Sequence, residues 1–221
     1  MSKLPLWAKA GALTLFSYGV WKALSFLLAI LNPRRIRCWF SDGQARDQVI
    51  SKSAALQEGW RELEALGFRL LGVKHEKLPL GGRHAWELST VSPIAEAFAS
   101  IVLKGNGEPF IIYFYTPLLE GGLVYTRQRS TFLGELESRN TSIKNIDSTN
   151  LGDLLASHRE RLAAFKQKGF HPLLVDSQGG RIEATYAFYT SGYAKKIMAS
   201  SALFNLLFYL MLALFLLFGR W

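Results

Sequence analysis

The stretch 202–218 reads ALFNLLFYLMLALFLLF and contains no charged residue. A second long apolar stretch, 10–31, reads AGALTLFSYGVWKALSFLLAIL and contains one charge, Lys22. At a rise of about 1.5 Å per residue, a helix of either length crosses most or all of a hydrocarbon core about 30 Å thick. The sequence therefore predicts an integral membrane protein with two spans, one toward each end of the chain.

The segment between the apolar ends carries every acidic residue and is long enough for one ordinary domain. We therefore divide the chain into an N-terminal transmembrane helix (1–32), a central domain (33–196) and a C-terminal transmembrane helix (197–221). The first apolar stretch is longer than the core of a signal peptide and runs into Asn32-Pro33-Arg34-Arg35. We expect it to be retained as a span.

The net charge of +9 and the pI near 9.7 at first suit a nucleic-acid partner. However, nine basic residues in or beside the apolar ends supply the whole excess, and the other seventeen Lys and Arg are matched by seventeen Asp and Glu. The nine are Lys3, Lys9, Lys22, Arg34, Arg35, Arg37, Lys195, Lys196 and Arg220. This placement argues against nucleic acid and indicates attraction to the headgroups of a lipid bilayer.

The same basic residues predict the orientation of the protein. Positive charge beside a span tends to stay on the cytoplasmic side of the membrane. Three of the nine lie on the far side of the spans, and five flank the spans on the domain side: Arg34, Arg35, Arg37, Lys195 and Lys196. We therefore expect a cytoplasmic central domain with both termini outside. The single cysteine, Cys38, cannot form an internal disulfide, which agrees with that compartment.

Polar side chains of the first span recur at three- and four-residue steps and so form one stripe along a helix. The stripe consists of Thr14, Ser17, Tyr18, Trp21, Lys22 and Ser25. If the spans run antiparallel, Lys22 lies at a depth close to that of Asn205 and Tyr209. We expect Lys22 to turn toward one of these two residues. The alternatives are that Lys22 extends to the interface, or that the stripe faces a helix of another membrane protein.

The central domain reads as helices at both ends and strands in the middle. Helical spacing covers 51–67 and 153–169, and a further helix from Arg181 could run into the second span with a kink at Gly192. Strand candidates separated by glycine-rich turns are 68–73, 84–90, 97–104, 110–116 and 123–129. A short strand at 170–175 is possible, and 134–150 reads as a loop. The predicted fold class is α+β, an antiparallel sheet flanked by helices and inserted between two transmembrane helices.

The four histidines are the residues best suited to a metal or acid–base site: His75, His84, His158 and His171. Their spacing gives no support, because none forms a His-x-x-x-His pair and there is no second cysteine. His158 falls on the apolar side of a helix, where we expect a hydrogen-bonded core residue. No Gly-x-Ser-x-Gly motif is present. The sequence therefore predicts no catalytic residue, no metal ligand and no cofactor.

Two function classes remain open. The leading one is a membrane-tethered, non-enzymatic domain that binds a partner, such as an accessory subunit of a membrane complex. The alternative is a domain that binds or processes a lipid or another apolar ligand at the bilayer surface. Six tyrosines could line a pocket for such a ligand: Tyr113, Tyr115, Tyr125, Tyr186, Tyr189 and Tyr193. Convergent polar groups at a cavity would favour the alternative.

Overall fold

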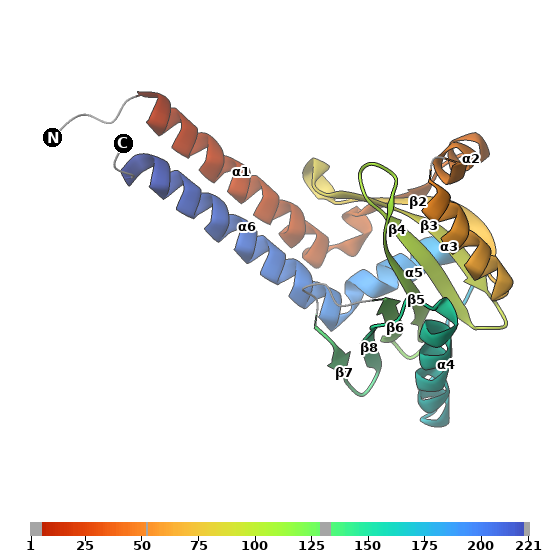
Figure 1. Cartoon of the computed structure of the whole chain (residues 1–221). Coiled ribbons are helices and arrows are strands. Elements are labelled where there is room, and N and C mark those ends of the chain that lie inside the picture. Colours follow the sequence, from red (N-terminus) through yellow and green to blue (C-terminus); the bar gives the residue numbers. More distant parts are fainter. Residues whose placement is uncertain (1–5, 52, 129–133, 219–221) are drawn as a thin grey trace. The chain divides into compact units, whose positions relative to one another are not determined.

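A computed structural model describes residues 6–51, 53–128 and 134–218 (Figure 1). The chain divides into two compact units. One, the helix-pair unit, contains Met1–Arg37, Lys77–Arg83 and Gly192–Trp221. The other, the domain, contains Cys38–Glu76 and His84–Ser191. Two of the predicted basic residues, Lys3 and Arg220, lie outside the described residues.

The helix-pair unit contains two long apolar helices, α1 (Leu6–Leu31) and α6 (Gly192–Phe218) (Figure 1). Both are long and apolar enough to cross a membrane, by length and composition. The predicted spans, 10–31 and 202–218, each lie inside one of these helices. Each apolar end of the sequence therefore forms a long helix, as predicted.

The two helices pack antiparallel through close contacts at small residues. Gly11 lies against Leu216, and Gly19 lies against Tyr209. A Cβ atom at Gly19 would stand 2.7 Å from the Cβ of Tyr209, closer than two carbons approach. Gly19 therefore allows the two backbones to come together, as small residues do between membrane helices.

The buried and exposed residues of the pair differ in size. The buried ones are mostly small: Ala8, Ala12, Gly19, Ala23, Ser25, Ala29, Ala194, Met198, Ala202 and Ala213. The exposed ones are mostly large and apolar, and include Leu13, Phe16, Leu24, Leu27, Leu203, Phe204, Leu207, Phe208, Met211, Leu214 and Phe215. Such a largely apolar exterior suits contact with lipid rather than water.

A turn completes the helix-pair unit. The segment 77–83 includes the short helix η2 (Pro79–Gly81) and packs against α1. The Ser25 hydroxyl donates a hydrogen bond to the Pro79 carbonyl at 2.7 Å. A Cβ at Gly82 would lie 2.1 Å from the Ser25 oxygen, so only glycine fits there. One member of the predicted polar stripe, Ser25, thus has its partner in this turn.

The domain is built on an eight-stranded sheet in the order β1-β2-β3-β4-β5-β6-β8-β7. Its strands are β1 (Arg37–Phe40), β2 (Arg69–Lys77), β3 (His84–Ser92), β4 (Ala97–Leu103), β5 (Pro109–Pro117), β6 (Leu123–Gln128), β7 (Leu136–Glu137) and β8 (Thr141–Ile146). Pairing is antiparallel from β3 through β6 and between β7 and β8, whereas β8 runs parallel to β6. The apolar strand β5 lies inside the sheet, as predicted.

Three of the four helices of the domain begin at side-chain caps. They are α2 (Gly43–Ser51), α3 (Ala54–Ala65), α4 (Leu151–Gln167) and α5 (Gln178–Thr190). Ser53, Asn150 and Ser177 accept hydrogen bonds from the first-turn N–H groups of α3, α4 and α5. These caps explain where the three helices start.

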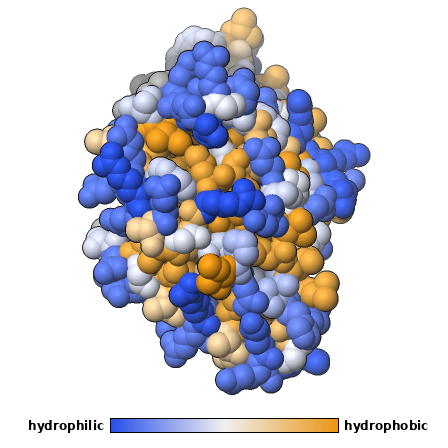
Figure 2. Space-filling view, turned by 90° about the vertical axis from the view of Figure 1, so that its right-hand side faces the viewer, coloured by the Kyte–Doolittle hydropathy of each residue, from blue (hydrophilic) through white to orange (hydrophobic). Residues whose placement is uncertain are grey.

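Alternating residues of the central strands face different helices. On β4, Ala99 and Ile101 join a hydrophobic core with Leu56 of α3 and Leu154 of α4. The intervening Ser100 faces Arg181 of α5 on the other side of the sheet. Apolar packing thus fills one face of the sheet, and polar groups fill much of the other. Figure 2 shows an outer face of the domain, where hydrophilic residues surround small apolar patches.

The α+β fold class is confirmed, and four details of the prediction are corrected. The predicted helix 51–67 is only α3, because Ser53 caps a new helix after α2 ends. The predicted loop 134–150 contains the two-residue edge strand β7 and the strand β8 beside it, which has little apolar alternation. The predicted strand 170–175 forms only an isolated bridge between Leu118 and Pro172. The strand β1 and the helix α2 were not predicted.

Candidate functional site

The polar residues of the spans contact one another mainly through aromatic rings. The Lys22 ammonium lies 5.3 Å from the ring centre of Tyr18 and 5.2 Å from that of Trp21. The Tyr18 ring in turn meets the Tyr209 ring edge-on at 5.0 Å. Asn205 donates to the Ser201 carbonyl of its own helix. The direct approach of Lys22 to Asn205 or Tyr209 therefore stays a prediction.

The five basic residues on the domain side of the spans are all exposed: Arg34, Arg35, Arg37, Lys195 and Lys196. The first two lie in the short helix η1 (Pro33–Arg35), which Asn32 caps directly after α1. The lysines lie near the start of α6. Exposure leaves these charges accessible to lipid headgroups.

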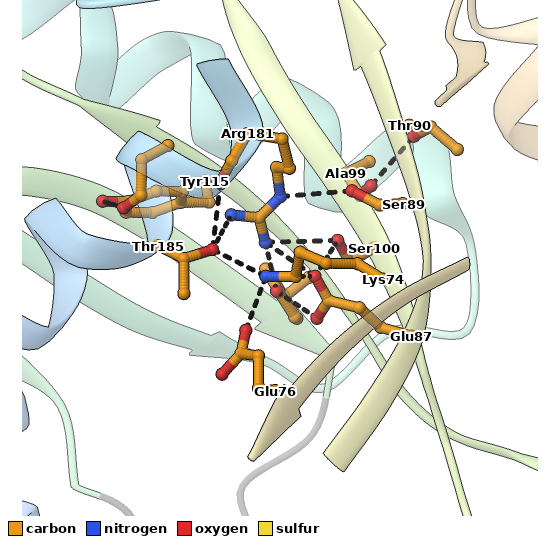
Figure 3. Close-up of polar contacts among 12 residues, drawn as sticks. Lys74, Glu76, Glu87, Ser89, Thr90, Ala99, Ser100, Tyr115, Arg181 and Thr185 are labelled. Carbon is orange, nitrogen blue, oxygen red and sulfur yellow. Dashed lines mark hydrogen bonds and ion pairs between the residues drawn. The ribbon is translucent and has the colours of Figure 1, made fainter. Parts of the chain in front are cut away.

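A buried charged cluster lies beneath α5, on the polar face of the sheet (Figure 3). Lys74 of β2 is fully buried and bonds Glu76 at 2.5 Å and Glu87 at 2.9 Å. Arg181 of α5 bonds the same Glu87 oxygen at 2.8 Å. Two cations thus face two carboxylates, so the charges of the cluster balance.

Neutral hydroxyl groups complete the hydrogen bonding of this cluster. Thr185 accepts from Lys74 at 2.7 Å and donates to the Arg181 carbonyl. The Tyr113 hydroxyl accepts from Arg181 at 2.7 Å and donates to Glu87 at 2.5 Å. Among the described residues, no buried side-chain nitrogen or oxygen lacks a hydrogen-bond partner. The cluster is therefore a satisfied core that attaches α5 to the sheet.

The protonation states agree with this structural role. Burial raises the pKa of Glu87, but the charges of Lys74 and Arg181 outweigh it and lower the pKa to about 2. Burial raises the pKa of the Tyr113 hydroxyl well above its usual value, so Tyr113 remains a donor. Glu87 is therefore ionised at neutral pH, and the Lys74, Glu87 and Arg181 side chains are buried.

The histidine on α4 is a core residue, as the sequence analysis expected. His158 is fully buried, with Nε2 3.0 Å from the Thr116 hydroxyl and Nδ1 2.8 Å from the Thr126 hydroxyl. Thr116 donates its own proton to the Glu96 carbonyl. The Thr116 oxygen must therefore accept from Nε2–H, which leaves Nδ1 as the acceptor of a neutral ring. Burial lowers the pKa of His158 to about 3.

Two other histidines meet on the opposite edge of the sheet, together with a serine. The Ser41 hydroxyl lies 2.6 Å from His75 Nε2, and His75 Nδ1 lies 3.1 Å from His84 Nε2. Ser41 follows β1, His75 lies near the end of β2, and His84 begins β3. We call these three residues the Ser–His–His row. It joins a hydroxyl to two imidazoles in one hydrogen-bonded chain.

Aromatic side chains hold the rings of this row. Trp39 stacks on His75 with ring centres 5.1 Å apart and planes 10° apart, and on His84 at 5.6 Å and 12°. Trp86 lies parallel to His75 at 6.1 Å. Burial, with the neighbouring His84, lowers the pKa of His75. The ring is therefore neutral at neutral pH and able to accept a proton.

The expectation that the histidines are isolated is wrong for His75 and His84. Their spacing along the chain hides a contact between neighbouring strands, since the turn 77–83 returns β3 beside β2. The predicted turn at Leu80-Gly81-Gly82 was the available signal. In a hairpin, two residues that lie directly or diagonally opposite each other on the two strands have side chains on the same face of the sheet. His75 and His84 are such a pair.

The remaining candidates are structural. Burial raises the pKa of the Cys38 thiol to about 12, which makes this cysteine a poor nucleophile. Tyr113 stacks on Tyr125 at 4.9 Å, and Tyr115 bonds the Ala184 carbonyl. Three of the tyrosines proposed to line a pocket thus pack against one another and α5. Within the described ranges, no group of three or more His, Cys, Asp or Glu is placed to hold a metal.

No protein-family model, curated protein or solved structure matches the chain.

Proposed function

We propose that this chain is a two-span membrane protein that holds its α+β domain at the cytoplasmic surface and acts there as a partner-binding or accessory subunit. The observation that carries the proposal is the helix pair, which buries small residues and exposes large apolar ones. Because the two spans are antiparallel, the chain crosses the membrane once in each direction, and both termini lie on the same side. The domain and the termini then lie on opposite sides of the membrane.

The cytoplasmic side is favoured by the exposed basic residues that flank the two spans. Arg34 and Arg35 follow α1, and Lys195 and Lys196 begin α6. Charges of this sign are retained on the cytoplasmic side during insertion and are attracted to its anionic lipids.

A partner within the membrane is favoured by the polar stripe of α1. Thr14, Ser17 and Tyr18 are exposed, although the packing of α1 on α6 could have covered them. Polar side chains on the outside of a helix pair are better satisfied by another protein helix than by lipid. This stripe is the surface through which we expect the protein to join a complex.

Photo-crosslinking tests the partner. A photoreactive amino acid at Ser17 should yield a discrete larger adduct in native membranes, which mass spectrometry would identify. Leu207 is the control, because it is exposed on α6 and should face lipid. Equal labelling from both positions, or none from Ser17, would contradict a partner at the stripe.

A second function is favoured by one observation, the Ser–His–His row. It brings one hydroxyl and two imidazoles together, which is the polar half of what a domain that processes a lipid or another apolar ligand needs.

A further inference from the structure

Ser41 occupies a position that suits a nucleophile. It stands between the end of β1 at Phe40 and the start of α2 at Gly43. The first helical bond there runs from the Arg46 N–H to the Asp42 carbonyl. The preceding N–H groups of the first turn have no partner within α2. Ser41 therefore lies two residues before the first turn of α2, where the positive end of the helix dipole favours negative charge on a substrate oxygen.

One of the two possible directions of proton donation along the Ser–His–His row is compatible with base catalysis by His75. If the Ser41 hydroxyl donates to His75 Nε2, then His75 Nδ1–H donates to His84 Nε2. All three groups are then neutral, and His75 is ready to take the serine proton. The same bond from Nδ1 holds the imidazole in the tautomer that this step requires.

We propose that the Ser–His–His row is a hydrolytic site for carboxylic esters, with Ser41 as nucleophile, His75 as general base and His84 as a positioning residue. This reaction class is inferred from residues of the domain and does not depend on the membrane location. Trp39 and Trp86 fix the His75 ring by stacking, so its orientation does not depend on substrate.

The proposed reaction has two steps. Ser41 Oγ attacks the ester carbonyl carbon while its proton passes to His75 Nε2, and the alcohol leaves with that proton. Water then attacks the acyl-Ser41, again giving a proton to His75, and the carboxylic acid is released as the proton returns to Ser41. The sum is ester plus water to acid plus alcohol, with no other reactant.

The substrate class follows from how strongly the row stabilises a protonated His75. The third member is a neutral imidazole rather than a carboxylate, so it stabilises the His75 imidazolium less. An ester has a better leaving group than an amide and suits this weaker base. The source of the ester rests on the proposed function: a protein held in a membrane by its own helices meets lipid esters there, so a membrane lipid is favoured over a soluble ester.

The test uses the full chain in mild detergent with a fluorophosphonate probe and p-nitrophenyl butyrate. The probe should label Ser41, as peptide mass spectrometry would show. Ser41→Ala and His75→Ala should each lower ester hydrolysis at least about 100-fold. Ser51→Ala and His171→Ala remove an exposed serine and an exposed histidine and should leave the rate unchanged.

His84 requires a readout of positioning. His84→Leu should lower the rate about tenfold or more, whereas His84→Gln, whose side-chain oxygen still accepts from His75 Nδ1–H, should recover much of it. A phospholipid vesicle arm separates the two ester sources. Faster turnover of vesicle lipid than of the soluble ester supports the lipid, and the reverse rejects the lipid while keeping the hydrolase.

Three results would overturn the proposal. These are no probe adduct on Ser41, hydrolysis that survives Ser41→Ala, or stoichiometric zinc that is lost with His75→Ala and His84→Ala. The zinc result would make the row a metal site. None of these results bears on membrane insertion, which is measured separately, so failure of the hydrolase leaves the anchor untouched.

Discussion

The helix pair and the domain are built in opposite ways. The pair buries alanine and glycine and exposes leucine and phenylalanine. The domain buries Lys74, Glu87 and Arg181 and shows a mostly hydrophilic surface (Figure 2). The difference is the one expected if the pair lies in lipid, as we propose, and the domain lies in water.

Different forces stabilise the two interiors. Between helices in lipid there is no hydrophobic driving force, so close contact at small residues such as Gly19 must hold the pair. In the domain, water drives apolar packing, and a buried ion pair is tolerated only because every member is hydrogen-bonded. Changes that break one kind of interior should leave the other unaffected.

The largest expected effect is the loss of domain stability in acid. The pKa of His158 falls from 6.5 to about 3 on folding, because burial disfavours the charged ring. The unfolded state therefore binds more protons between these values, and stability present above pH 6.5 is lost as the pH falls toward 3. The full shift corresponds to about 5 kcal/mol. Denaturant unfolding of the full chain between pH 7 and 3 measures it.

Two variants sharpen this prediction. His158→Asn should reduce stability at pH 7 and flatten its dependence on pH. His171→Ala, at an exposed histidine, should keep the dependence. An unchanged slope in His158→Asn would show that another group is responsible.

Breaking the buried charged cluster comes next. Arg181→Met leaves Glu87 buried with fewer partners and should cost about 3–5 kcal/mol of unfolding free energy. Arg69→Met is the matched control, because Arg69 pairs with Asp176 at the surface, where a pair contributes at most about 1 kcal/mol. Urea unfolding of both variants gives the comparison, and similar losses would contradict a cluster that attaches α5.

The smallest expected effect lies in the helix pair. Gly19→Val would force the helices apart at Tyr209, at a cost of about 1–3 kcal/mol. Disulfide formation between cysteines at 11 and 216, in a Cys38→Ser background, should fall about tenfold. Gly192→Val meets nothing within 4 Å and serves as control. Unchanged cross-linking in Gly19→Val would mean that the pair packs elsewhere.

The helix pair could be predicted from the sequence more completely than the domain. The spans depend on composition over many residues, so the sequence predicts them well. The sheet order was predictable where short turns connect neighbours, but the parallel pairing of β8 with β6 was not, because β8 has little apolar alternation and its partner is not the preceding strand in the sequence. The fold class could therefore be predicted, and the edge of the sheet could not.

The sites were harder, because their members come together only in three dimensions. Lys74 and Arg181 are separated by more than a hundred residues, and no local pattern relates them. His75 and His84 are nine residues apart across one turn, so a register assigned to that hairpin would have shown the pair. Ser41 gave no signal, because β1 is too short and α2 too polar to be recognised.

The most direct measurement is protease protection in sealed, cytoplasmic-side-out vesicles, with an epitope tag at each end of the chain. The account predicts that protease removes the domain while both tags survive on protected fragments containing α1 and α6. Tags digested together with the domain would contradict the two spans. A protected domain with accessible tags would contradict the cytoplasmic orientation.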